Sequence, residues 1–351
     1  MKKGTFLVFV ALLALASSAS YFYIQNDSAK MLTQSAQQIV SDSLPKPKLA
    51  PSPIPFEELT IPYLQKQTYD SSLAQLVQVK NTSTHLGYTT SYLSDGLKVN
   101  GYLAVPKGEA PAGGFPAVVL VHGYIPPQNY QTLSNYISFA DALAAEGIVV
   151  FKIDLRGHGD SEGSAEGAYF SGDYVVDTLN AYDALQKAEF VNPNKVGLWG
   201  HSMAGNVLLR SMTVEPSIPK VVIWAGAVYS YQDMIDYGIQ DSSYRPPTAD
   251  SERQSRRDTL FDTHSRFNQE SDFWETVAAT NYTQDIEGEI QLHHAVNDTV
   301  VSIEYSRNLS QLLDETQVPH QLYEYNSGGH NLTGSTFNQA IQRTANFLST
   351  Y

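Results

Sequence analysis

The stretch VGLWGHSMAGNVLLRSM, residues 196–212, joins an apolar run to a helix-like segment through one tight turn. VGLW is typical of a buried strand, and NVLLRSM carries apolar side chains at helical spacing. Gly200 and Ala204 flank Ser202 at positions where strand and helix backbones crowd together and only small residues fit. The pattern places the Ser202 hydroxyl above the end of a strand. Ser202 is therefore a candidate nucleophile, and a helix N-cap serine is the alternative.

Apolar runs and helix-like segments alternate from residue 82 onward. Because the runs are apolar through their length, each is typical of a strand that is buried on both faces. This α/β pattern predicts a mostly parallel central sheet with helices on both faces. A hairpin is predicted around Ser94-Asp95-Gly96. Further strands are predicted at 115–123 (FPAVVLVHG), 148–157 (IVVFKIDLRG), 195–200 (KVGLWG), 221–228 (VVIWAGAV), 290–296 (IQLHHAV) and 320–326 (HQLYEYN), and helices at 137–146, 173–190, 206–212 and 303–315.

Residues 229–289 separate two predicted strands and are far longer than a crossover connection needs. The segment is polar, but it also contains many aromatic residues, which argue against disorder. We expect a helical lid over the strand ends. A disordered excursion is the alternative.

A second serine, Ser161, lies in GDSEG (159–163), which satisfies the pattern Gly-x-Ser-x-Gly in full. No apolar periodicity follows this motif, so no helix is expected to begin there. Asp160 and Glu162 flank the serine and would oppose a developing negative charge. The motif lacks its structural context, and we interpret it as a glycine-rich loop at the top of the sheet.

A nucleophilic serine needs a base, and the base needs a third group to orient it. On this kind of fold the chain order is Ser, then acid, then His. Asp298 follows the predicted strand 290–296, and His330 lies in a glycine loop after the last predicted strand. Both are expected at the carboxyl edge of the sheet, where functional groups gather. Asp233, soon after the strand that ends at residue 228, is a rival for the acid.

Five other histidines are interpreted as structural. His293 and His294 lie within one strand without a third ligand spaced nearby, so no metal site is expected. His122, His158 and His201 lie at turns. The chain has no cysteine, which excludes disulfides and thiolate chemistry. No metal and no organic cofactor is expected.

The tetrahedral intermediate of such a reaction needs two N–H donors. Met203, directly after the candidate nucleophile, is expected to supply one. The other is expected from the loop HGYIPP after the strand 115–123, and Tyr124 is our candidate.

The N-terminus begins with MKKG and continues with an uncharged apolar stretch to residue 24. Residues 1–24 are predicted to be a signal peptide or an N-terminal membrane anchor, and either would export the chain. Residues 25–60 are predicted to be a spacer, with closely spaced prolines at 45–55 that favour an extended backbone. Residues 61–351 are predicted to form the catalytic domain.

The chain has 351 residues, of which 42% are hydrophobic, enough for one large domain or two ordinary ones. Its formal net charge is −14, without a basic stripe. Nucleic acid is therefore not an expected partner. The expected partners are a small ester or a short peptide, with a possible membrane tether through the N-terminal segment.

Five segments of the chain, in their order, resemble motifs of the α/β-hydrolase superfamily. They are VVLVHGYIPP, DLRGHGDSEG, GLWGHSMAGNV, HAVNDTVV and SGGHNL. In detail they are most similar to its prolyl-oligopeptidase-like and dienelactone-hydrolase-like members, over roughly residues 80–351. The resemblance implies Ser202 as nucleophile, His330 as base and Asp298 as the orienting acid. Ala204 departs from the glycine of close relatives.

These observations predict an exported or membrane-tethered serine hydrolase that resembles a carboxylesterase and cleaves an ester or amide bond. A serine peptidase acting on short peptides is one alternative. The prolyl-oligopeptidase-like peptidases carry a β-propeller before the catalytic domain, and no propeller is expected in the residues before this sheet. A catalytically inactive surface-binding module is the other alternative, although an intact Ser, Asp and His set argues against it.

Overall fold

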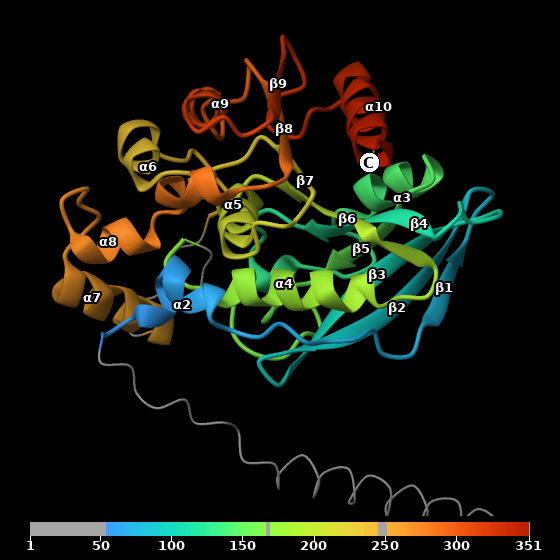
Figure 1. The fold of residues 1–351 in the computed structure, drawn as a ribbon, viewed down its shortest axis with the longest axis horizontal. Coiled ribbons are helices and arrows are strands. Elements are labelled where there is room, and N and C mark those ends of the chain that lie inside the picture. The colour runs from blue at the N-terminus through green and yellow to red at the C-terminus, as the bar shows by residue number, and fades with distance from the viewer. Residues whose placement is uncertain (1–53, 166–168, 245–250, 351) are drawn as a thin grey trace, which may run out of the picture. The chain divides into compact units, whose positions relative to one another are not determined.

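A computed structural model describes residues 54–165, 169–244 and 251–350, with backbone alone at residue 252. Within these residues nine strands form one sheet in the order β1-β2-β3-β5-β4-β6-β7-β8-β9. The sheet is antiparallel from β1 to β5 and parallel from β5 to β9. The predicted mostly parallel sheet is confirmed (Figure 1). The strands are β1 (Val77–Asn81), β2 (His85–Ser94), β3 (Leu97–Pro106), β4 (Phe115–Val121), β5 (Val149–Ile153), β6 (Val191–His201), β7 (Lys220–Trp224), β8 (Glu289–Ala295) and β9 (His320–Tyr325).

The antiparallel end of the sheet is built from the predicted hairpin. Ser94 of β2 pairs with Leu97 of β3, so the turn contains only two residues. Gly96 in that turn has φ +75°, a conformation that glycine adopts without steric cost. The edge strand β1 is absent from the prediction, because its exposed side chains give no apolar signal.

Helices cover both faces of the sheet, as predicted. One face carries α4 (Asp173–Gln186), α5 (Ala204–Val214) and α9 (Glu304–Glu315), and the other carries α3 (Ile137–Ala145) and α10 (Ser335–Ser349). Figure 1 shows α4 and α5 on the opposite side of the sheet from α3 and α10. Two layers of buried apolar side chains result, and all five residues of β5 are buried.

The insertion between β7 and β8 is helical, as predicted. It contains α6 (Tyr231–Tyr237), α7 (Glu252–His264), α8 (Asp272–Val277) and the 3-10 helix η3 (Ala279–Asp285). Aromatic side chains pack these pieces together: the Tyr231 ring lies 5.3 Å from the rings of both Phe267 and Trp274. This packing excludes the disordered alternative for the described part of the insertion.

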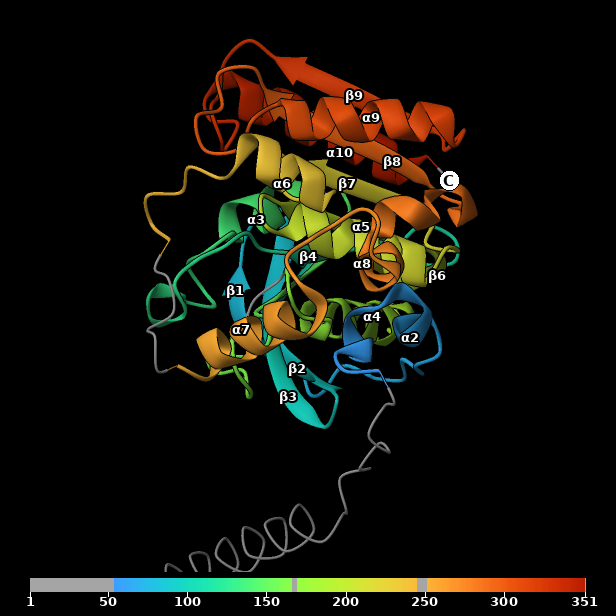
Figure 2. The same cartoon turned by 90° about the vertical axis from the view of Figure 1, so that its left-hand side faces the viewer.

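The insertion does not extend over all the strand ends as a lid would. Figure 2 shows α6, α7 and α8 along the flank that carries α4 and α5. Arg256 of α7 donates to the carbonyl of Phe170 and pairs with Glu58, both on that flank. Near the predicted site, the Tyr244 ring lies 5.5 Å from the Tyr124 ring. The described insertion is therefore mainly a side wall with one edge at the site.

Residues at the end of the predicted spacer belong to the packed domain. The 3-10 helix η1 (Glu57–Leu59) and α2 (Ile61–Gln65) precede the sheet. Leu59 is fully buried, and its carbonyl accepts a hydrogen bond of 2.6 Å from buried Arg210. The spacer predicted over 25–60 is thus too long at its C-terminal end, because periodicity cannot detect one buried turn.

The predicted signal peptide or anchor (1–24) and most of the predicted spacer lie outside the described residues. Among the helices that the structure describes, none combines the length and the apolar character that a bilayer crossing requires.

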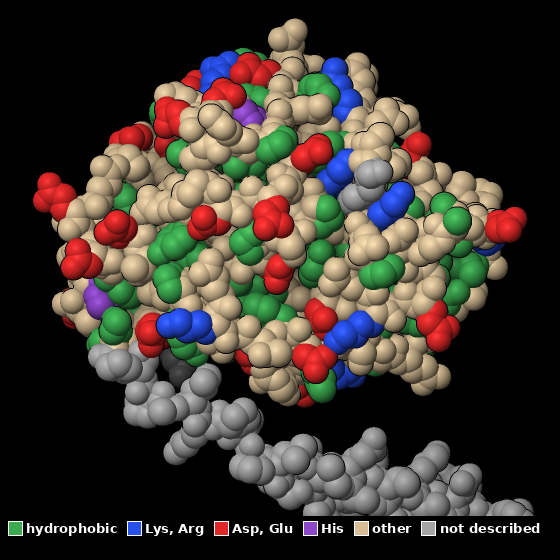
Figure 3. Space-filling view, in the orientation of Figure 1, with side chains coloured by type: hydrophobic (Ala, Val, Ile, Leu, Met, Phe, Trp, Pro, Cys, Tyr) green, Lys and Arg blue, Asp and Glu red, His purple; other side chains and the backbone are tan. Residues whose placement is uncertain are grey.

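The surface of the described domain reflects the acidic composition. Figure 3 shows Asp and Glu side chains scattered over one face, with Lys and Arg side chains in small separate groups. This face offers no continuous basic stripe of the kind that a nucleic-acid backbone needs.

Candidate active site

Ser202 lies at the turn between β6 and α5. Its φ is +58°, a left-handed conformation that costs a non-glycine residue free energy. The strain is held in place by the sheet: the Ser202 N–H donates to the carbonyl of Trp224 at 3.0 Å, and the Ser202 carbonyl accepts from Ala227 at 2.9 Å. The turn therefore holds the hydroxyl above the strand end, as the sequence predicts.

Crowding at this turn explains the small residues around Ser202. A Cβ at Gly200 would lie 2.7 Å from the Cβ of Ala204, so these two positions share one confined space. A Cβ at Gly205 would lie 2.8 Å from the Cα of Gly226. The turn thus accommodates the Cβ of Ala204, while Gly200 and Gly205 must both lack a side chain.

The structure brings Ser202, His330 and Asp298 together. Nε2 of His330 lies 2.9 Å from Oγ of Ser202, and Nδ1 of His330 lies 2.8 Å from Oδ2 of Asp298. The His330 side chain is 15% exposed and that of Asp298 is fully buried. His330 with its proton on Nδ1 donates to the carboxylate and can accept the serine proton at Nε2.

The Asp298 carboxylate is fully hydrogen-bonded. Its Oδ1 accepts from the backbone N–H groups of Val300 at 2.8 Å and Val301 at 3.1 Å, and its Oδ2 lies 3.2 Å from Nε2 of His294. Burial alone would raise the pKa of Asp298, but hydrogen bonds from His294 and His330 outweigh burial and lower it. The acid therefore stays ionised beside the histidine that it orients.

The rival serine lies elsewhere. Oγ of Ser161 accepts a hydrogen bond of 2.9 Å from the N–H of Asn100 in β3, and the Ser161 N–H donates to the carbonyl of His158. Among the residues that the structure describes, the next helix after the motif begins only at Asp173. The GDSEG segment is a loop fastened to the edge of β3, as interpreted from the sequence.

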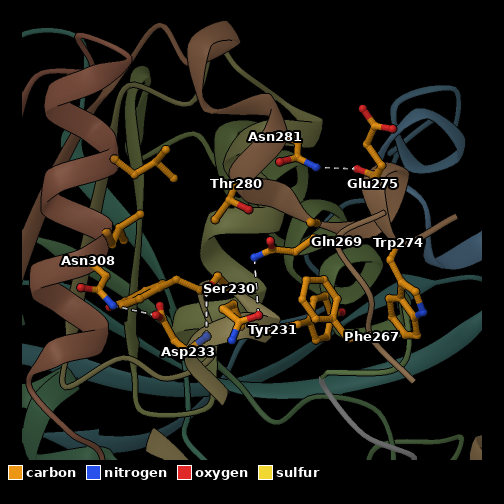
Figure 4. A pocket seen from close by; sticks show the side chains of 15 residues that line it. Ser230, Tyr231, Asp233, Phe267, Gln269, Trp274, Glu275, Thr280, Asn281 and Asn308 are labelled. Atoms are coloured by element: carbon orange, nitrogen blue, oxygen red, sulfur yellow. Dashed lines mark hydrogen bonds between the residues drawn. The ribbon is translucent and has the colours of Figure 1, made fainter. Parts of the chain in front are cut away.

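The rival acid is likewise separate from His330. Asp233 lies on α6 and accepts a hydrogen bond of 2.7 Å from the Asn308 side chain of α9. Figure 4 shows both at one side of a cavity of about 410 Å³, with Trp274 and Phe267 at the other. Ser202, His330 and Asp298 do not line this cavity.

Two other strand histidines have roles that the sequence does not separate. His293 is buried between Tyr325 and Gln291, which lie 2.8 Å from its two ring nitrogens. His294, the next residue, points to the opposite face of β8 and reaches Asp298. Because side chains alternate along a strand, His293 and His294 are predicted to point to opposite faces of the sheet. That Asp298 returns to His294 depends on the loop after β8, which the alternation does not describe.

The candidate oxyanion donors lie on two sides of Ser202. Met203 has helical backbone angles (φ −46°, ψ −35°) and directly precedes α5, where N–H groups lack intrahelical acceptors. Tyr124 follows Gly123, and a Cβ at Gly123 would lie 3.0 Å from the Cβ of Ser202. Only glycine at position 123 allows this loop to approach the serine so closely.

Sequence reasoning missed two further residues at the site, Tyr136 and His201. The Tyr136 hydroxyl lies 2.6 Å from Nδ1 of His201, and the His201 ring lies 4.6 Å from the His330 ring. Burial lowers the pKa of His201 to about 3, so the ring is neutral near neutral pH. The position of His201 beside the serine favours a structural interpretation of that histidine, and Tyr136 gives no sequence signal.

Comparison with known proteins finds similarity to hydrolases. A family model described as serine aminopeptidase S33 matches residues 115–245. The uncharacterized peptidase YtmA of Bacillus subtilis is 25% identical over 247 residues, which are 69% of this chain and 85% of that protein.

Solved structures show the same fold at low identity. An acetyl xylan esterase from Paenibacillus sp. R4 superposes with a TM-score of 0.60 at 17% identity, over 83% of this chain and 92% of that one. A puromycin-hydrolyzing peptidase of Mycobacterium tuberculosis gives 0.56 at 17% identity, over 77% of this chain and 40% of that one. Esterases and peptidases thus share this architecture.

Proposed function

We propose that the chain is a serine-type hydrolase of the α/β-hydrolase superfamily and that it cleaves carboxylic esters through an acyl-enzyme on Ser202; its similarity to hydrolases in sequence and fold supports this. The observation that carries the proposal is the hydrogen-bonded series from Ser202 to His330 to Asp298, at 2.9 and 2.8 Å. The strained φ of Ser202 supports it, since such strain persists where function requires it.

In the first half-reaction, Oγ of Ser202 attacks the carbonyl carbon while Nε2 of His330 takes the serine proton. The carbonyl π electrons move to oxygen, and the N–H groups of Met203 and Tyr124 stabilise the oxyanion. Each such donor contributes roughly 3 kcal/mol to transition-state stabilisation. His330 then gives the proton to the leaving group as the C–O bond breaks.

In the second half-reaction, water attacks the acyl carbon and His330 takes its proton. The tetrahedral intermediate collapses, the acid product leaves, and Ser202 recovers its proton from His330. Asp298 stays ionised throughout and stabilises the imidazolium that forms in each half-reaction. No other co-reactant is needed for this cycle.

A peptidase acting on short peptides is the second candidate. The matching family model is described as an aminopeptidase, and YtmA is called a peptidase, so amide cleavage has specific support. The same residues would serve both reactions, because His330 can protonate an amine as well as an alcohol leaving group.

Active-site titration of the full-length chain with a fluorophosphonate tests the proposal. We expect stoichiometric labelling at Ser202, lost in Ser202→Ala and in His330→Ala. Ser161→Ala is the matched control and should label fully. Parallel assays with p-nitrophenyl esters and an aminoacyl anilide then compare ester with amide cleavage. Labelling at Ser161, or no label on a folded chain, would refute the mechanism, and the second result would favour a binding module.

A further inference from the structure

Three hydrogen bonds connect the loop that carries Tyr124 to the loop that carries His330. The Gly123 N–H donates to the Tyr136 hydroxyl oxygen at 2.9 Å. The Tyr136 hydroxyl lies 2.6 Å from Nδ1 of His201, and Nε2 of His201 lies 2.8 Å from the carbonyl oxygen of His330. The two ends of this series are the residue before a candidate oxyanion donor and the candidate base itself.

The donors and acceptors of this series fit only one arrangement of protons. The His330 carbonyl can only accept, so His201 must carry its proton on Nε2. Nδ1 of the neutral ring then accepts from the Tyr136 hydroxyl, whose oxygen accepts in turn from Gly123. Each group is satisfied once, and a second proton on His201 would remove the acceptor that Tyr136 needs.

The backbone of Tyr136 is strained where it makes this connection. Its φ is +62° and its ψ is 7°, in the left-handed region, directly before α3. This conformation costs a bulky aromatic residue free energy, and backbone strain of this kind is found most often at functional positions. The Tyr136 ring also stacks on Phe139 at 5.2 Å, which fixes the direction of its hydroxyl. Helix initiation alone does not require a tyrosine at this position.

We propose that Tyr136 and His201 are positioning residues that hold the oxyanion loop and the base loop in one fixed relation to Ser202. The proposal rests on the proposed function, because it assigns these residues to the same site. Their role is to keep the Tyr124 N–H and the His330 ring aligned with one reacting carbonyl. Since a displacement of about 1 Å at a reacting group can reduce the rate about 100-fold, a link between the two loops has catalytic consequence.

The variants Tyr136→Phe and His201→Phe, and the double variant, test the link. Each single variant should lower kcat for a p-nitrophenyl ester about 10–100-fold, with KM changed less than about 3-fold, because alignment matters most in the transition state. The double variant should be little worse than the worse single variant, because both break one series. His201→Gln keeps an amide donor and an acceptor and should recover part of kcat.

Tyr92→Phe is the matched control. Tyr92 is buried and donates from its hydroxyl to the Asp177 carbonyl at 2.9 Å, away from the site. The variant Tyr92→Phe should lose about as much stability as Tyr136→Phe, but its kcat should stay at the wild-type value. If Tyr136→Phe and Tyr92→Phe both keep kcat within about 3-fold, or if the two link variants act additively, the positioning role is refuted.

A readout without catalysis separates this inference from the proposed function. In ¹⁵N-detected NMR of the imidazole rings, His201 should be neutral with its proton on Nε2 from pH 5 to 8. In Tyr136→Phe its Nδ1 resonance should shift, because that nitrogen loses its donor. If the wild-type chain is not labelled at Ser202, the proposed function fails and the catalytic role of the link fails with it, whatever the NMR shows. If Ser202 is labelled but His201 carries its proton on Nδ1, the link alone is refuted.

Discussion

Nε2 of His294 lies 3.2 Å from Oδ2 of Asp298, so the carboxylate that faces His330 has a second histidine beside it. His294 is fully buried in β8, and its other ring nitrogen lies 2.8 Å from the Ser306 hydroxyl of α9. Strand β8 and helix α9 therefore hold the His294 ring in place, and the His294 ring in turn orients the Asp298 carboxylate. Asp298 is oriented by the core of the domain and not only by its own loop.

Replacing Asp298 by asparagine should reduce kcat/KM for an ester by about 10⁴-fold, because the amide cannot hold His330 with its proton on Nδ1. Steady-state ester hydrolysis measures the change. Asp233→Asn is the matched control and should stay within about 3-fold of the wild type, since Asp233 contacts Asn308 instead. A large loss in Asp233→Asn would restore it as the rival acid.

Ser202→Gly should unfold at higher urea concentration than Ser202→Ala. Both lack the hydroxyl, but glycine adopts φ +58° without steric cost, while alanine keeps the strain of roughly 1–2 kcal/mol. The higher entropy of unfolded glycine offsets part of the gain, so we expect about 0.5–1 kcal/mol. Equal or lower stability of Ser202→Gly would show that the turn is not strained.

The domain should lose stability as the pH falls from about 6.5 towards 4. Burial lowers the pKa of His201 and of His293 to about 3, from an ordinary value near 6.5. Between these two pKa values the histidines are protonated in the unfolded chain but neutral in the folded chain. The free energy of unfolding therefore rises with pH, and stability is lost on acidification. Each such histidine contributes about 1.4 kcal/mol per pH unit within the window.

Urea unfolding at several pH values checks this prediction. His293→Gln removes one of the buried histidines and should make the dependence shallower by about 1.4 kcal/mol per pH unit. Asp298 acts in the same direction at lower pH: its lowered pKa gives stability above about pH 4 that is lost on further acidification. A urea midpoint that is constant between pH 7 and 4.5 would contradict the assignment of neutral buried histidines.

Lys152→Met should destabilise the domain by about 3–5 kcal/mol, because it leaves the Asp154 charge buried without its partner. Both side chains are fully buried, with Nζ of Lys152 2.7 Å from Oδ1 of Asp154. Tyr130 and Thr132, from the loop after Tyr124, donate to the same carboxylate at 2.7 and 2.5 Å. Urea unfolding measures the loss.

The double variant Lys152→Met with Asp154→Asn is the control for this pair. It removes both charges, so it should recover part of the lost stability. If the single variant Lys152→Met is as stable as the wild type, then water or another group compensates the buried negative charge of Asp154.

Local sequence patterns suffice for much of this fold. The strand VGLW, the small residues at 200 and 204 and the apolar spacing of α5 each report a neighbour within a few residues, so they predict the turn at Ser202. Chain order on such a sheet then places Asp298 and His330 at its carboxyl edge. The structure brings these three residues together as expected.

Other features depend on contacts between residues far apart in the chain. The edge strand β1 and the turn at Leu59 lack a periodic signal. The sequence of the insertion predicts that it is helical, but it does not predict the flank of the domain on which these helices pack. Periodicity records which face of an element is apolar, and it does not record what covers that face.

The sequence by itself determined the layered α/β sheet, the strained turn at Ser202 and the identity of its candidate partners, because strand, turn and helix preferences act over short distances. Only the tertiary structure decided that His294 supports Asp298 and that Tyr136 and His201 join the loop of Gly123 and Tyr124 to the loop of His330. These hydrogen bonds form between separate elements, and their geometry exists only once the sheet brings those elements to one edge.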